Sequence, residues 1–83
     1  MPTILKFDGF RVVIYSNDHV PEHVHVIGSD CEAIFLLNCP NGPPTLRESF
    51  EFKARSLRKV AAKLNEELQA LCSAWENIHG RDR

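Results

Sequence analysis

The spacing of apolar residues changes once along this chain, near Ala54, and this change limits the folds that the chain can adopt. Before Ala54, apolar residues occur in short runs, some of them alternating with polar residues as in β-strands. After it, apolar residues recur every three or four positions, as on a helix with one apolar face: Leu57, Val60, Ala61, Leu64, Leu68, Leu71, Trp75 and Ile78. The pattern predicts one long helix over about residues 54–79.

The segment before the helix divides into strands and turns. Residues 3–7, 10–15, 23–27 and 31–37 have strand patterns, and residues 46–52 could add a fifth strand. Asp8-Gly9, between the first two, favours a tight hairpin turn. We therefore expect one α+β domain over residues 1–83. Its four- to five-stranded, mainly antiparallel sheet, at about 3–52, would be packed on one face by a single long C-terminal helix.

Composition excludes several classes of protein. The net charge of −1 gives no overall field that would favour nucleic acid or acidic membranes. No apolar run approaches the roughly 20 residues needed to span a bilayer. No signal-peptide pattern is visible, so we expect a cytoplasmic protein. Cys31, Cys39 and Cys72 are odd in number and follow no CxxC spacing, which favours reduced thiols, with Cys72 in the core.

The side chains best suited to chemistry are concentrated between Tyr15 and Val26. Three of the four histidines lie there, His19, His23 and His25, together with Asn17, Asp18 and Glu22. Alternation along a strand places His23 and His25 on one face and the intervening valines on the other. The valines are expected to face the helix-covered core, and the histidines to point away from it.

Three interpretations of this cluster remain open. His23, His25 and Asp18 could bind a divalent metal ion, because paired histidines and a carboxylate are common ligands. His23, His25, His19 and Asp18 could instead catalyse general acid–base chemistry, since histidine titrates near neutral pH. The histidines could also be solvated surface beside a turn in which Asn17 and Asp18 bond to their own backbone.

Two further features suggest partners. Basic residues gather before and within the start of the helix, and Arg55, Arg58 and Lys59 could contact the phosphates of a nucleic acid or form a solvated face. A straight helix of this length would span about 37 Å, more than the roughly 30 Å diameter of such a chain. Its end, with Trp75 and Ile78, should overhang the sheet, which predicts a homodimer or a protein partner there.

The chain also resembles a family of small bacterial proteins that is known only as a domain of unknown function, numbered 4160. The resemblance covers nearly the whole chain and rests on these segments: Met1-Pro2-Thr3-Ile4, Gly9-Phe10-Arg11, Tyr15-Ser16-Asn17-Asp18-His19, Pro21-x-His23-Val24-His25-Val26 and Phe52-Lys53-Ala54-Arg55-x-Leu57-Arg58. Glu22 stands where the family usually has a second proline and adds a potential ligand or base. Genes of this family often lie beside a second small gene, in an arrangement similar to a toxin–antitoxin pair.

Three functions follow as hypotheses. The resemblance implies that the chain is a component of a toxin–antitoxin-like module, in which it could be an RNA-directed toxin that uses the histidine cluster. The alternatives are a non-enzymatic binding module (an antitoxin, a regulator or an inhibitor encoded on a mobile element) and a small metal-binding domain. If the resemblance holds, Asn17, Asp18, His19, His23 and His25 are the residues expected to act or to contact the partner.

Overall fold

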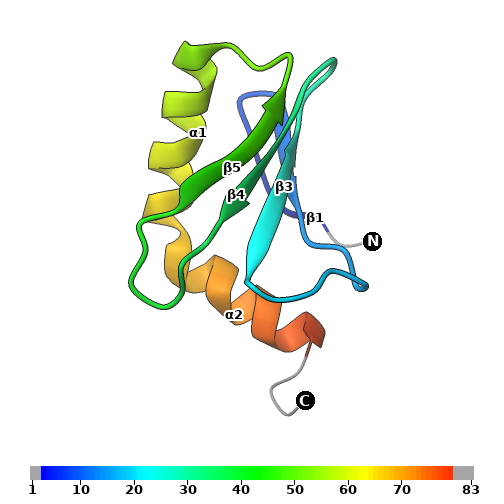
Figure 1. The fold of residues 1–83 in the computed structure, drawn as a ribbon, viewed down its shortest axis with the longest axis vertical. Coiled ribbons are helices and arrows are strands. Elements are labelled where there is room, and N and C mark those ends of the chain that lie inside the picture. The colour runs from blue at the N-terminus through cyan, green and yellow to red at the C-terminus, as the bar shows by residue number, and fades with distance from the viewer. Residues whose placement is uncertain (1–2, 80–83) are drawn as a thin grey trace.

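The computed structural model describes residues 3–79, so Met1, Pro2 and the ends of the predicted 1–83 domain lie outside the described part. Five strands form one antiparallel sheet in sequence order, β1-β2-β3-β4-β5, and two helices follow (Figure 1). The elements are β1 (Thr3–Phe7), β2 (Phe10–Val13), β3 (His23–Ile27), β4 (Glu32–Leu36), β5 (Thr45–Phe50), α1 (Ala54–Glu66) and α2 (Leu68–His79). The predicted α+β class and antiparallel sheet are confirmed, and the fifth strand is present.

The first hairpin shows how local sequence sets the register of the sheet. Asp8 and Gly9 have φ values of 50° and 82°. Two consecutive residues of positive φ form the turn whose twist matches that of paired strands, and Asp-Gly is a favoured sequence for it. Phe7 and Phe10 pair directly across this turn.

The core lies between one face of the sheet and the helices. Val24 and Val26 of β3 are fully buried there, with Phe35 of β4 and with Val60 and Leu64 of α1. His23 and His25 alternate with these valines and therefore lie on the opposite face, as predicted. α1 covers this core face, so the histidines lie on the other face, which the end of α2 reaches through Trp75.

The prediction of a single long helix is wrong. The helix ends at Glu66, and Glu67 has φ −102° and ψ 17° at the C-cap, outside helical geometry. A second helix then begins at Leu68, and Figure 1 shows α2 leaving the direction of α1 to run beneath the lower end of the sheet. The turn keeps the apolar stripe in contact with the sheet, so Leu68, Leu71 and Trp75 are buried.

This turn also removes the reason for expecting an overhanging apolar end. Trp75 is 5% exposed and belongs to the core of the chain itself. Ile78 is partly buried against the same core. Whether a partner binds at this end stays a prediction, but Trp75 offers it little free surface.

The prediction of three reduced thiols is also wrong. Cys39, in the segment between β4 and β5, forms a disulfide with Cys72 of α2, with 6.0 Å between their Cα atoms. Cys72 does pack against the core, as expected, but as half of this cystine. Cys31 is a free thiol. The turn into α2 brings the two partners together, and sequence spacing could not reveal that approach.

Neither helix in the described part of the chain is long and apolar enough to cross a membrane.

Candidate functional site

The site begins with two histidines on β3. The rings of His23 and His25 share one face of the strand, with their centroids 5.3 Å apart. Their side chains are only 9% and 13% exposed. Both imidazoles are therefore held in a largely enclosed position, although no helix lies over the centre of this face.

Asp18 comes to the same place from the loop between β2 and β3. Its backbone N–H donates to the Tyr15 carbonyl at 3.0 Å, and its carboxylate Oδ2 accepts the Tyr15 N–H at 3.1 Å. These reciprocal bonds form a turn that fixes the carboxylate. The Asp18 side chain is 13% exposed.

All three side chains converge on one small space. Asp18 Oδ2 lies 3.5 Å from His23 Nε2 and 3.4 Å from His25 Nε2. One ligand atom from each of the three residues can be chosen so that all lie within 4.8 Å of one another. The two histidines therefore present the same type of nitrogen, Nε2, to one carboxylate, and His25 Nε2 is also within 3.4 Å of Asp18 Oδ1, with which it forms a hydrogen bond.

The other ring nitrogens face acceptors outside this space. His23 Nδ1 is 2.9 Å from the Pro21 carbonyl oxygen. His25 Nδ1 is 3.4 Å from Oε2 of Glu32, which lies on β4, but it is buried and makes no hydrogen bond of good geometry. His23 is thus held from behind by a carbonyl oxygen, and His25 has a carboxylate near its second nitrogen.

Aromatic rings form the walls of the cluster. Tyr15 meets His25 edge-on at 4.7 Å between centroids, and Trp75 lies 5.4 Å from His23. His79 packs on the other side of Trp75, at 4.0 Å. Since Trp75 and His79 belong to α2, the turn between the helices is what closes this side of the site.

The atoms around the two rings are mostly hydrogen-bond acceptors. A carbonyl oxygen only accepts, so His23 carries its proton on Nδ1, and a neutral His23 would turn the lone pair of Nε2 toward the Asp18 carboxylate. His25 has a carboxylate near each nitrogen but a single proton when neutral. A cation at the centre would satisfy these acceptors.

The distances to Asp18 are compatible with a bound cation. Hydrogen bonds from imidazolium to carboxylate are usually about 2.7–2.9 Å long, shorter than the 3.4–3.5 Å found here. Two ligands of a tetrahedral ion, each about 2.0–2.1 Å from the metal, lie about 3.3–3.4 Å apart. Metal-bound histidines also commonly donate their second N–H to a carbonyl or carboxylate, the role that Pro21 and Glu32 fill here.

Several residues predicted for the site lie apart from it. Asn17 and His19 are exposed on the loop, outside the three-residue cluster. Glu22 lies instead beside Trp75 and the Cys39–Cys72 disulfide, around a shallow hollow.

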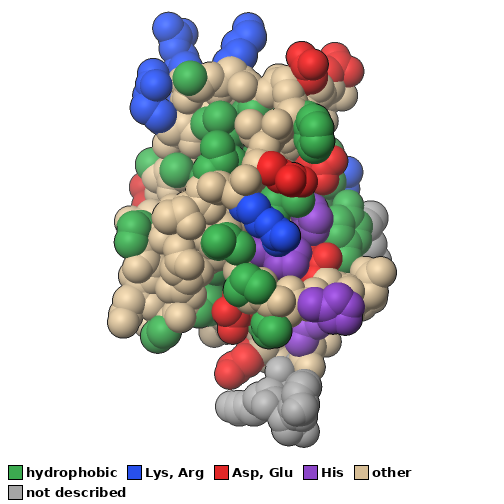
Figure 2. Space-filling view, in the orientation of Figure 1, with side chains coloured by type: hydrophobic (Ala, Val, Ile, Leu, Met, Phe, Trp, Pro, Cys, Tyr) green, Lys and Arg blue, Asp and Glu red, His purple; other side chains and the backbone are tan. Residues whose placement is uncertain are grey.

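The predicted phosphate contacts also lie elsewhere. Arg55, Arg58 and Lys59 are exposed in the first turns of α1. Figure 2 shows a group of Lys and Arg side chains at the upper end of the molecule, where α1 begins, whereas the histidines lie from the middle of the view downward, with acidic side chains and a further Lys or Arg side chain against them. The structure therefore does not bring these cations and the histidines into one site.

Two residues of the site were missed from the sequence. Glu32 pairs with Ile27 across β3 and β4, which places it diagonally from His25 on the same face. Tyr15 follows β2 and contacts both Asp18 and His25. The one sequence feature that could have placed Glu32 in the site is the short turn between β3 and β4, because its length sets the register of these strands.

The fold and the site together define a class: a small α+β domain whose exposed sheet face carries a two-histidine, one-carboxylate cluster. The family model described as "Domain of unknown function (DUF4160)" matches residues 9–76, and the chain belongs to this family. The match includes the whole cluster, which confirms the resemblance read from the sequence. No curated protein and no solved structure matches the chain significantly.

Proposed function

We propose that this chain is a metal-binding domain in which Asp18, His23 and His25 hold one divalent transition-metal ion. One observation carries the proposal. The Nε2 atoms of both histidines lie 3.4–3.5 Å from the same carboxylate oxygen, while both Nδ1 atoms face oxygen acceptors. This arrangement suits a cation at the centre.

The ligand set favours an ion that accepts nitrogen as well as oxygen. Imidazole suits Zn²⁺, Fe²⁺, Ni²⁺ and Cu²⁺, whereas Mg²⁺ and Ca²⁺ prefer oxygen ligands. Three protein ligands leave at least one coordination position for water or substrate, as in catalytic zinc sites. The 9–13% exposure of the three side chains leaves a narrow approach from solvent.

The test is a calorimetric titration of untagged, chelator-treated protein with Zn²⁺. We expect one equivalent to bind, and Asp18→Ala, His23→Gln and His25→Gln each to weaken binding by about 100-fold or more, because each removes a direct ligand. His19→Gln is the matched control, since it removes an exposed histidine that lies next to Asp18 in sequence but outside the cluster.

Circular dichroism would confirm that each variant folds. Binding of less than about a tenth of an equivalent to folded wild-type protein at slightly alkaline pH, where protons compete least with the metal, would overturn the proposal. So would folded variants at all three positions that bind as tightly as wild type.

A component of a toxin–antitoxin-like module is the second candidate, in which the chain would act on RNA. It is favoured by the 5.3 Å spacing of the two imidazoles beside Asp18, which would let one ring accept a proton and the other donate one. Phosphate charge would have to be balanced without Arg55, Arg58 and Lys59, because α1 begins at the other end of the molecule (Figure 1).

Growth and RNA integrity after induction of the chain alone test this candidate. We expect growth arrest with fragmented RNA, lost in a His23→Ala/His25→Ala variant of equal solubility. Normal growth with intact RNA from folded wild-type protein would reject the toxin. Arrest that survives the double variant would indicate binding rather than histidine chemistry.

A further inference from the structure

The strand at the end of the sheet is open on its outer edge. β5 pairs with β4 on one side only, and all six of its residues are exposed. Leu46 and Phe50 are 46% and 64% exposed, although both are large and apolar. An edge strand of this kind presents unpaired N–H and C=O groups to which a further strand can bond.

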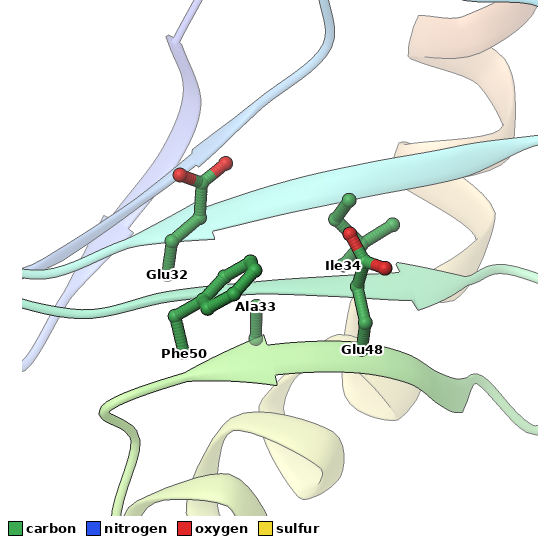
Figure 3. Close-up of a pocket in the computed structure, with 5 residues that line it drawn as sticks. All are labelled: Glu32, Ala33, Ile34, Glu48 and Phe50. Carbon is green, nitrogen blue, oxygen red and sulfur yellow. The ribbon is translucent and has the colours of Figure 1, made fainter.

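A hollow on the sheet face borders this edge. Figure 3 shows Glu32 and Ile34 of β4 and Glu48 and Phe50 of β5 projecting from one face, while Ala33 points to the other. Ile34 and Phe50 supply apolar surface, and the two glutamates supply negative charge. Such a surface fits a cationic side chain with an apolar stem, as arginine has.

The edge strand carries such a side chain itself. Across β4 and β5, Ile34 pairs with Glu48 and Phe35 with Leu46, so Arg47 has no partner in the ladder. Arg47 is exposed and takes part in none of the ion pairs found among residues 3–79. Its charge is therefore free to meet an acidic group on a second molecule.

We infer that β5 pairs antiparallel with β5 of a second copy of this chain, about a two-fold axis between Arg47 and Glu48. In this register Arg47 of each copy faces Glu48 of the other, beside the hollow. Leu46 then faces Ser49, and Thr45 faces Phe50. A shift by one position sets Glu48 against Glu48 or Arg47 against Arg47, and like charges that face each other are unfavourable.

The symmetric pairing has a structural consequence. Both copies use the same surface, so the assembly closes as a dimer and does not extend into a filament. The two sheets join into one through the outer edge of β5 in each copy, and β1 remains at each end of the joined sheet. The inference does not depend on the metal site, which lies on β3 and the preceding loop.

Sedimentation velocity of the full chain from low to high micromolar concentration, with chelator present, tests the inference. We expect a dimer whose dissociation constant rises about tenfold or more in Arg47→Glu and in Glu48→Arg, because each turns two attractive cross-strand pairs into repulsive ones. The double variant Arg47→Glu/Glu48→Arg restores opposite charges in the same register, so it should dimerise as wild type does.

Lys59→Glu, an exposed charge reversal on α1, is the matched control and should leave the dimer unchanged. Hydrogen exchange at high protein concentration should show added protection of the amides of residues 45–50. A monomer at all concentrations would overturn the inference. So would a dimer that survives both single reversals, or one that the double variant fails to restore.

Discussion

At the scale of single residues, His25 is the side chain that the site constrains most. Its Nε2 atom faces Asp18 and its Nδ1 atom faces Glu32, at 3.4 Å on each side. The alternation of β3 is enough to place His25 beside His23, and the sequence predicted that pair. It could not predict that Glu32 lies behind His25, because this depends on how the turn at residues 28–31 sets the register of β4.

Glu32 is therefore expected to act on the metal through His25. Glu32→Ala should weaken Zn²⁺ binding by about 10- to 100-fold, the usual effect of losing a carboxylate that orients a ligating histidine. Glu32→Gln should lose less, because the amide oxygen can still accept from Nδ1. Glu48→Ala, which removes an exposed carboxylate that pairs with Ile34, is the control. Equal affinities in all three variants, measured by calorimetry, would show that Glu32 has no such role.

At the scale of elements, the strands were predictable and the break in the helix was not. Runs that alternate or carry β-branched residues marked β1 and β3 to the residue, and Asp8-Gly9 marked the hairpin. The helical spacing continues from Leu64 through Leu68 to Leu71, and all three are buried. Apolar spacing records which side of a helix is covered. It does not indicate a change in the direction of the helix axis, so the sequence did not predict the break at Glu67.

That break has a direct effect on the site. A straight helix would have carried its last turns past the sheet, whereas α2 brings Trp75 to 5.4 Å from His23. The histidine pair could therefore be predicted from β3 alone, but its enclosure could not. Asp18 is an intermediate case, because the sequence placed it near the pair and only the turn with Tyr15 fixes its carboxylate.

At the scale of the whole molecule, the Cys39–Cys72 disulfide joins the segment after β4 to α2 across 33 positions of sequence. No local pattern links the two cysteines, and an odd number of cysteines argued against pairing. The bond closes a large loop in the unfolded chain and so should stabilise the fold by about 3–4 kcal/mol in the chain-entropy model. It also holds α2 where Trp75 packs against His23.

Reduction should therefore lower the melting temperature. A reductant, or the Cys39→Ala/Cys72→Ala variant, should reduce Tm by about 10–20 °C for a domain of this size, as followed by circular dichroism. Cys31→Ser removes the free thiol and is the control, with the full response to reductant retained. A wild-type Tm that does not change on reduction would show that the bond adds nothing to stability.

The placement of Trp75 gives the protein an intrinsic fluorescent probe of the histidine cluster. The chain contains a single tryptophan, so all indole emission comes from a ring packed 5.4 Å from His23. A paramagnetic ion such as Cu²⁺ bound between the histidines would quench that emission, and a filled-shell ion such as Zn²⁺ would alter it far less. Occupancy could thus be followed in unlabelled protein, with His79→Gln separating quenching by an ion in the cluster from quenching by one at the histidine stacked on Trp75.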